Sequence, residues 1–211
     1  QKLSGFLYPD DTTEDGKRLR LMQQYFFTSA GVKSVLRRHK AKYGTLANLA
    51  DKAVFHINDT HPTLIIPELL RILLDEEGME WDVACGIVQA ATAYTNHTIM
   101  SEALEKWPVY LIQPVLPRVF QLIEEINRRF TNRLIERYSY NQIDLVNRMA
   151  IIAGGQVRMA NLCLVACRSV NGVAKLHTEI LKNIEMNDFY RLDPDKFKNV
   201  TNGITHRRWL I

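Results

Sequence analysis

The sequence has little cysteine. Cys85, Cys163 and Cys167 are the only thiols among 211 residues, and none of them has CxxC spacing. An odd number of cysteines without metal-ligand spacing argues against a disulfide framework and against a structural zinc site. We therefore expect buried, reduced thiols in a cytoplasmic protein, with Cys163 and Cys167 on one face of a helix.

Long apolar runs and a strong charge of one sign are also missing. No run of about 18 apolar residues and no signal-peptide pattern occurs, so we expect neither a membrane partner nor secretion. The chain has 27 Lys and Arg residues against 23 Asp and Glu residues, and the net charge of +4 is scattered. Because no nucleic-acid-binding motif accompanies this charge, we expect no nucleic-acid partner.

Glycine and proline are scarce too, with 10 and 7 residues, which leaves room for long helices. Apolar spacing predicts a long helix from Leu19 to about Lys42. An apolar stripe predicts a second one from Pro117 to Leu134, with ion pairs Glu124–Arg128 and Glu125–Arg129 on its polar face. Shorter helices are expected over residues 64–74, 81–91, 142–152 and 173–183, and the apolar run 157–167 fits a strand or a helix.

Strand signals are few. Residues 53–57 form a short β-rich run, after which Thr60 and Pro62 predict the start of a helix. Residues 200–204 predict a further strand that breaks into a turn at Asn202-Gly203. Because helices separate the strands, we expect parallel pairing and a helix-rich α/β fold.

Three polar segments are candidate site positions, because open α/β sheets bind ligands beyond the carboxyl ends of their strands. They are residues 56–62, the expected loop 94–98, and Asn171-Gly172 together with Asn202-Gly203. His56, Asp59 and His61 suit a divalent metal by residue type but match no known ligand pattern. Alternatively, Asp59 orients a neighbouring backbone group or His61. No GxSxG elbow or Gly-rich phosphate loop is present, so motifs alone leave the chemistry open.

Several longer segments resemble the α-glucan (glycogen) phosphorylase family. They are LYPDD…GKRLRLMQQYFF (7–27), HINDTHPTLIIPELLRILLDEEG (56–78), AYTNHTIMSEALEKWPV (93–109), LPRVFQLIEEINRRF (116–130), VNGVAKLHTEILK (170–182) and FKNVTNGITHRRWL (197–210). They follow the family's order and cover nearly the whole chain. The resemblance implies reversible phosphorolysis of α-1,4-glucan (glycogen, starch or maltodextrin) by inorganic phosphate, with glucose 1-phosphate as the product.

The resemblance also implies a two-lobed glycosyltransferase fold of the GT-B type. Residues 1–211 are similar to the second half of its Rossmann-like N-terminal lobe, so we expect a single fragment of a longer, bacterial-type enzyme. A start at Gln1 and an apolar end at Ile211 agree with this expectation. The family's pyridoxal phosphate is held by a lysine of the C-terminal lobe. We therefore expect this chain alone to bind no cofactor and to be inactive, and the full-length enzyme to be a cytoplasmic homodimer.

Site residues follow from the same resemblance. The main-chain carbonyl of His97 is expected to face the glucosyl ring and to stabilise the positive charge of the transition state. Asn202 resembles the residue that binds the sugar 6-hydroxyl, with Val173 beside it. The other expected substrate-binding residues are Asp59, His61, Ala103, Glu105 and, on a gating loop, Asp11. The resemblance implies no metal ligand.

Some positions depart from the animal enzymes of the family. The gating loop Asp10–Thr13 lacks their aromatic residue, and Ala153-Gly154 replaces acidic residues of their glycogen-storage site. Arg37-Arg38 resembles a nucleotide-binding pair, but it equally fits a solvated helix end, so allosteric control stays open. The alternative function is a stand-alone carbohydrate-binding or interaction module, which would need an exposed aromatic platform.

Overall fold

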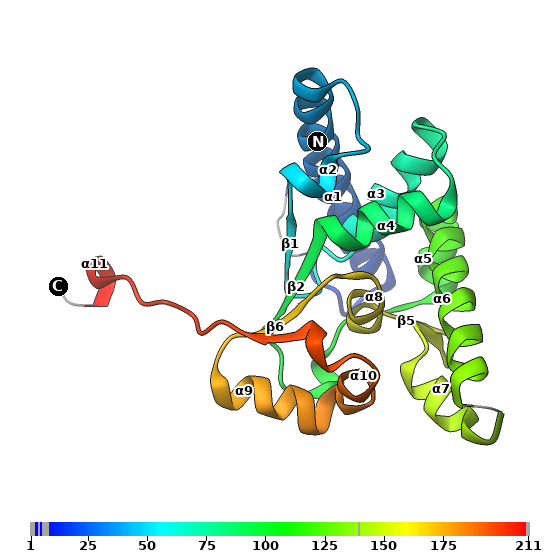
Figure 1. The fold of residues 1–211 in the computed structure, drawn as a ribbon, viewed down its shortest axis with the longest axis vertical. Helices are drawn as coiled ribbons and strands as arrows, with labels where there is room; N and C mark the ends of the chain where they lie inside the picture. The colour runs from blue at the N-terminus through cyan, green and yellow to red at the C-terminus, as the bar shows by residue number, and fades with distance from the viewer. Residues whose placement is uncertain (1–2, 4, 6–8, 139, 210–211) are drawn as a thin grey trace.

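The computed structural model describes Leu3, Gly5 and residues 9–138 and 140–209 (Figure 1). Gln1 and Ile211, to which the expectation of a fragment refers, lie outside these residues. A four-stranded parallel sheet of order β1-β2-β6-β7 forms the centre of the fold. Its strands are β1 (Phe55–Asn58), β2 (Thr92–Asn96), β6 (Val170–Gly172) and β7 (Phe197–Asn199).

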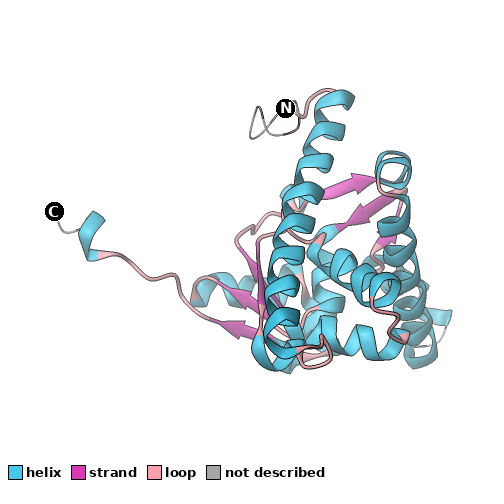
Figure 2. Cartoon of the chain, turned by 90° about the horizontal axis from the view of Figure 1, so that it is seen from above, coloured by secondary structure: helices cyan, strands magenta, loops and turns pink. Residues whose placement is uncertain are grey.

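Helices surround this sheet (Figure 2). In chain order they are α1 (Glu14–Tyr43), α2 (Leu49–Lys52), α3 (Ile65–Arg71), α4 (Trp81–Ala91), α5 (Val109–Val115), α6 (Pro117–Tyr138), α7 (Ile143–Met149), α8 (Met159–Ala166), α9 (Lys175–Ile180), α10 (Asn187–Leu192) and α11 (His206–Trp209). Short π-helical turns, η1 (Ile72–Glu76) and η4 (Leu181–Glu185), extend α3 and α9, and 3-10 turns are η2 (Ser101–Ala103), η3 (Tyr140–Gln142) and η5 (Pro194–Lys196). α8 packs on β2, and α9 packs on β6 and β7. The predicted helix-rich α/β class is confirmed.

A second sheet contradicts the expectation that all strands pair in parallel. β3 (Lys106–Pro108), β5 (Gln156–Arg158) and β4 (Ile152–Ala153) are antiparallel. β4 and β5 are joined by Gly154 and Gly155, whose φ angles of 58° and 70° are those of a type I′ hairpin turn. The helix expected over 142–152 therefore ends at Met149, and the ambiguous run 157–167 divides into the end of β5 and α8.

The expected polar loop 94–98 is wrong over residues 94–96 and holds only at residues 97 and 98, because residues 92–96 form the buried strand β2. Its polar side chains are satisfied inside the protein. Asn96 Nδ2 donates to the Tyr94 hydroxyl at 2.9 Å, and the Thr92 hydroxyl donates to the Val88 carbonyl at 2.8 Å. A parallel strand that is buried on both faces lacks the alternation of apolar and polar residues that marks a half-buried strand. The polar residues of β2 therefore gave no strand signal in the sequence.

Three smaller expectations fail as well. The strand predicted at 200–204 lies instead at Phe197–Asn199, and the chain then runs away from the sheet toward α11 (Figure 1). Thr60 does not cap α3, which begins only at Ile65. On α6, Arg128 and Arg129 both pair with Glu125, so the predicted Glu124–Arg128 pair is absent from the described residues.

Both long helices are present, but α1 begins at Glu14, five residues before its predicted start, and α6 ends at Tyr138, four residues after its predicted end. α1 begins at the cap Thr13, whose hydroxyl accepts the Gly16 amide, and ends at Gly44 with a φ of 73°. The apolar stripe of α6 is buried as expected, from Val119 to Leu134. Cys163 and Cys167 are buried and Cys85 is half-buried, and all three are free.

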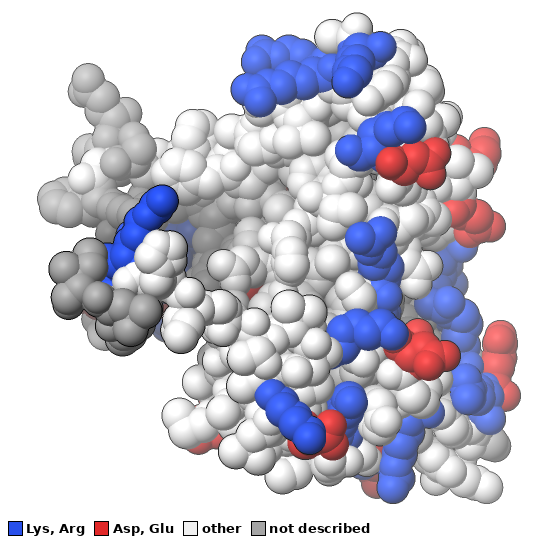
Figure 3. Space-filling view, turned by 60° about the vertical axis from the view of Figure 1, so that its left-hand side comes forward, with Lys and Arg blue, Asp and Glu red and all other residues white. Residues whose placement is uncertain are grey.

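On the face drawn in Figure 3, basic side chains predominate over acidic ones, but they lie in several separate groups, some of them beside acidic residues. Within the described residues, no helix is long and apolar enough to cross a membrane. The scattered charge predicted from the sequence is thus visible on this face.

Candidate functional site

The three polar segments meet at the carboxyl edge of the parallel sheet. β1 ends at Asn58, whose partner in the ladder is Thr95, and β2 ends at Asn96, whose partner is Gly172. The segments that follow these strands therefore leave the sheet side by side. This edge is where parallel sheets place ligands.

Asp59 holds two of these segments together. Its φ of 60° is unusual for a residue other than glycine, and its amide donates to the Thr95 carbonyl at 2.8 Å. The carboxylate accepts the Thr60 amide at 2.6 Å through Oδ1 and the Thr98 hydroxyl at 3.1 Å through Oδ2. Asp59 thus orients neighbouring backbone, as one prediction had it. A hydrogen bond to His61 does not occur among the described residues.

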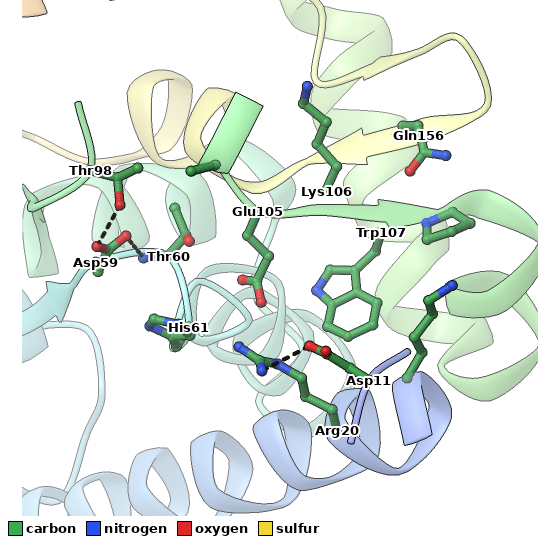
Figure 4. A pocket seen from close by; sticks show the side chains of 13 residues that line it. Asp11, Arg20, Asp59, Thr60, His61, Thr98, Glu105, Lys106, Trp107 and Gln156 are labelled. Atoms are coloured by element: carbon green, nitrogen blue, oxygen red, sulfur yellow. Dashed lines mark hydrogen bonds and ion pairs between the residues drawn. The ribbon is translucent and has the colours of Figure 1, made fainter. Parts of the chain in front are cut away.

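A cavity of about 430 Å³ opens beside Asp59 (Figure 4). Five of the eight predicted site residues line it, and they come from three distant parts of the chain: Asp11, Asp59, His61, Ala103 and Glu105. Thr60 and Thr98, from two of the candidate segments, also line the cavity, together with residues that the sequence did not single out: Lys17, Arg20, Lys106, Trp107, Pro108 and Gln156. Charges of both signs therefore face the same space.

Arg20 anchors the acidic residue of the predicted gating loop. Its guanidinium lies 3.0 Å from Asp11 Oδ2, in an ion pair that joins α1 to the segment before it. Figure 4 shows this pair at the side of the cavity opposite Glu105 and Trp107. A helical arginine nine residues from its partner gives no local signal, so the sequence did not reveal it.

Glu105 and Trp107, which line this cavity, each carry a buried polar atom without a partner among the described residues. Trp107 is only 4% exposed, yet its indole N–H has no partner among the described residues. Glu105 accepts the Gln24 amide at 2.8 Å through one oxygen, and its other oxygen is likewise unpartnered within the described chain. Buried polar groups normally have partners. A free donor and a free acceptor in one cavity suit a hydroxyl-bearing ligand, since a hydroxyl serves both.

The remaining three predicted residues lie along the strand ends and do not line this cavity. His97 is exposed just after β2, and its Nε2 is hydrogen-bonded to Asn58 Oδ1. Its main-chain carbonyl accepts no hydrogen bond from the described residues. Val173 and Asn202 contact each other, because the Asn202 amide donates to the Val173 carbonyl at 3.0 Å. The predicted proximity of these two residues is confirmed.

Comparison with known proteins identifies the family to which the chain belongs. The sequence pattern of the family described as carbohydrate phosphorylase matches residues 1–211. The chain belongs to the carbohydrate phosphorylase family. It is 53% identical over 211 residues to glycogen phosphorylase from Bacillus subtilis, and 47% identical over 213 residues to that from Haemophilus influenzae. Its identity to the human muscle form is 46% over 222 residues. Each alignment covers the whole chain but only 26% of the relative, so the chain spans about a quarter of their length.

Phosphorylases use pyridoxal phosphate, and the described lysines do not fit that group. Lys196 is the buried lysine of the described chain, but its Nζ donates to the carbonyls of Leu164 at 2.6 Å and Val165 at 3.2 Å. In the cavity, Lys17 is paired with Glu14, and Lys106 is exposed. None of these three combines burial with an uncommitted amine, which a protected Schiff base requires.

A metal centre has no support in the described part of this phosphorylase chain. No group of three His, Cys, Asp or Glu residues there is arranged to hold an ion. His56, one member of the metal alternative, is instead hydrogen-bonded to the Thr95 hydroxyl at 2.6 Å. Within the described residues, the buried side-chain atoms without a partner are Glu105 Oε2, the Trp107 indole nitrogen, Gln24 Oε1 and Asn171 Oδ1.

Proposed function

We propose that the chain is a segment of an α-glucan phosphorylase and supplies part of its substrate site. The observation that carries this proposal is the convergence of five family positions, from three separate segments, on one cavity at the carboxyl edge of the sheet. The reaction joins a phosphate oxygen to the anomeric carbon of the terminal glucosyl unit. The bond from that carbon to the glycosidic oxygen breaks, and the oxygen leaves as the 4-hydroxyl of the shortened glucan after taking a proton.

The residues of this chain would bind and orient the sugar. The His97 carbonyl accepts no hydrogen bond from the part of the chain that the structure describes, so its dipole can face the positive charge that develops on the glucosyl ring. Asn202 would bind the 6-hydroxyl from the segment beside Val173. Glu105 and Trp107 would exchange hydrogen bonds with one hydroxyl in the neighbouring cavity.

The cofactor would be held by another part of the full-length enzyme. Pyridoxal phosphate supplies, through its phosphate group, the proton handling that the substrate phosphate needs. The described lysines are exposed or committed to other partners, so this chain alone should neither bind the cofactor nor turn over. The full-length enzyme would have the two lobes of a GT-B fold, form a homodimer and work in the cytoplasm.

A chimaera tests this function. The 211 residues replace the aligned quarter of the Bacillus subtilis glycogen phosphorylase, and glucose 1-phosphate release from maltodextrin and phosphate is measured. We expect activity in the chimaera and none in the isolated chain. A chimaera that folds and binds pyridoxal phosphate but releases no glucose 1-phosphate would contradict the proposal.

The tryptophans that the structure describes do not support the alternative of a stand-alone binding module, although Phe26, Phe27 and Tyr110 are exposed. Of the two tryptophans whose side chains the structure describes, Trp107 is buried and Trp81 lies under the guanidinium of Arg129, 4.7 Å from its ring centre. Isothermal titration of the isolated chain with maltoheptaose separates the two functions. We expect no binding at micromolar concentration, whereas the module requires it.

A further inference from the structure

His177 is a buried imidazole between two halves of the site. It lies on α9, is 5% exposed and uses both ring nitrogens. Nδ1 accepts the backbone amide of Val173 at 3.2 Å, and Nε2 lies 3.0 Å from Asn96 Oδ1. No family resemblance or site prediction singled out this residue.

These contacts fix the protonation of the ring. A backbone N–H can only donate, so Nδ1 must be unprotonated and Nε2 must carry the proton. Nε2 then donates to Asn96 Oδ1, and Asn96 Nδ2 donates to the Tyr94 hydroxyl at 2.9 Å. The hydrogen bonds therefore run in one direction, from Val173 through His177 and Asn96 to Tyr94. Asn96 and Tyr94 are both fully buried, so water cannot replace a missing partner.

The neutral ring is also the electrostatically favoured one. Burial lowers the pKa of His177, the nearby His97 lowers it further, and Asp59 partly opposes both. A proton on Nδ1 would point at the Val173 N–H and break that bond. The network thus requires the neutral ring with its proton on Nε2.

Each end of this network reaches a proposed substrate contact. Asn96 immediately precedes His97, whose carbonyl is proposed to face the glucosyl ring. Val173 is held on both sides, because its amide donates to His177 and its carbonyl accepts the Asn202 amide at 3.0 Å. Asn202 itself is exposed on the segment after β7, so this bond ties it to the sheet edge.

We propose that His177 is a positioning residue that sets the spacing between the His97 carbonyl and Asn202 across the sheet edge. The proposal rests on the proposed phosphorolysis for what these two groups bind. His177 touches no substrate in this scheme. It acts through Asn96 on one side and through Val173 on the other.

The tautomer is tested first, on the 211-residue chain itself and without any activity. Long-range ¹H–¹⁵N spectra at neutral pH should show Nε2 protonated and Nδ1 unprotonated. In His177→Phe, the amide signals of Val173 and Asn202 should shift. The matched control is His39→Phe, since His39 is equally buried at 6% exposure and also bonds an asparagine, Asn48, but lies on α1. A ring protonated on Nδ1, or equal shifts in both variants, would overturn the network.

Substrate discrimination in the chimaera tests the positioning role. The readout is the ratio of kcat/KM for glucose 1-phosphate to that for its 6-deoxy analogue, because this ratio does not depend on the fraction of folded enzyme. His177→Phe should lower the ratio by about tenfold, the factor that one neutral hydrogen bond contributes. His39→Phe should leave it unchanged. His177→Asn, whose Oδ1 can accept the Val173 amide in place of Nδ1, should keep most of the preference.

The outcomes separate the two proposals. A wild-type chimaera that folds and binds pyridoxal phosphate but has no activity overturns the proposed function and the positioning role with it. An active wild-type chimaera whose His177→Phe variant keeps the full preference for the 6-hydroxyl overturns the positioning role alone. So does a His177→Asn variant that loses the preference as completely as the Phe variant. If His177→Phe does not fold, the positioning role is judged from the His177→Asn variant and from the tautomer of the wild-type ring.

Discussion

Arg71 holds Glu68 in a bidentate ion pair within α3, with Nε 2.8 Å from Oε2 and Nη2 3.0 Å from Oε1. Glu68 is fully buried and also accepts the hydroxyls of Tyr25 at 2.9 Å and Ser29 at 2.7 Å, both on α1. All of its partners are donors. The carboxylate therefore joins α1 to α3.

Removing the charge of Glu68 should be strongly destabilising. Glu68→Gln removes the buried carboxylate partner of Arg71, which keeps only its more exposed pair with Glu76. The new amide nitrogen is a donor placed against one hydroxyl and one guanidinium N–H. We expect a loss of about 3 kcal/mol in the free energy of unfolding, measured by urea denaturation. Glu125→Gln is the control, because its two arginine partners lie on the surface and such pairs contribute less than about 1 kcal/mol. Equal losses in the two variants would contradict the role of burial.

The same carboxylate predicts a pH dependence. Burial by itself would raise the pKa of Glu68, but the hydrogen bonds from Arg71, Ser29 and Tyr25 outweigh it and lower the pKa from its ordinary value of 4.5. The stabilisation is therefore complete above pH 4.5 and is lost as the pH falls through the lowered pKa. The difference in unfolding free energy between wild type and Glu68→Gln should shrink as the pH is lowered. A difference that is constant or grows below pH 4.5 would refute this assignment.

Gly172 should not tolerate a side chain. A Cβ at this position would lie 2.2 Å from the Thr178 hydroxyl and 2.9 Å from its Cα, and the backbone atom cannot move independently of α9. Gly172→Ala should lower the unfolding free energy by about 1–3 kcal/mol, as overpacking does. Gly31→Ala is the control within α1, where no atom lies within 4 Å of the new Cβ. Gly31→Ala should raise the unfolding free energy by up to about 1 kcal/mol. Calorimetry should therefore show the melting temperatures of the two variants shifted in opposite directions.

Asn202 should matter for catalysis and little for folding, since its side chain is exposed. In the active chimaera, Asn202→Ala should lower kcat/KM by the equivalent of about 1–3 kcal/mol, because a buried sugar hydroxyl would lose its partner. Asn132→Ala, an exposed asparagine on α6, serves as the control. Unchanged kcat/KM in Asn202→Ala would remove this residue from the site.

Local patterns predicted the elements whose signals are local. Residues 81–91 form α4 with the predicted bounds, and the apolar stripe of α6 is buried as expected. β2 was missed because its Thr, Tyr and Asn side chains look solvated until their partners in three dimensions are known. The β4–β5 hairpin was missed although Gly154-Gly155 is a recognisable turn signal, so this error was avoidable.

The candidate site, too, was predicted only in part from the sequence. Motif resemblance supplied the residues that line the cavity from the loops, such as Asp59 and Glu105. It did not supply Arg20 or Trp107, and the partner of Glu105 is Gln24, 81 residues away in the sequence. Contacts of this kind depend on how α1 packs against α3 and α5, which no local spacing encodes.

The turn at Gly154-Gly155 also decides what the cavity wall is made of. Gln156, the first residue of β5, lines the cavity, whereas Val157 is fully buried on the opposite side of the strand. Because side chains alternate along a strand, one extra residue in the turn would shift the register and exchange these two positions. A valine would then face the ligand, and a glutamine would enter the core. The length of the Gly154-Gly155 turn, which does not itself line the cavity, thus determines whether β5 contributes an amide or an apolar side chain to the cavity wall.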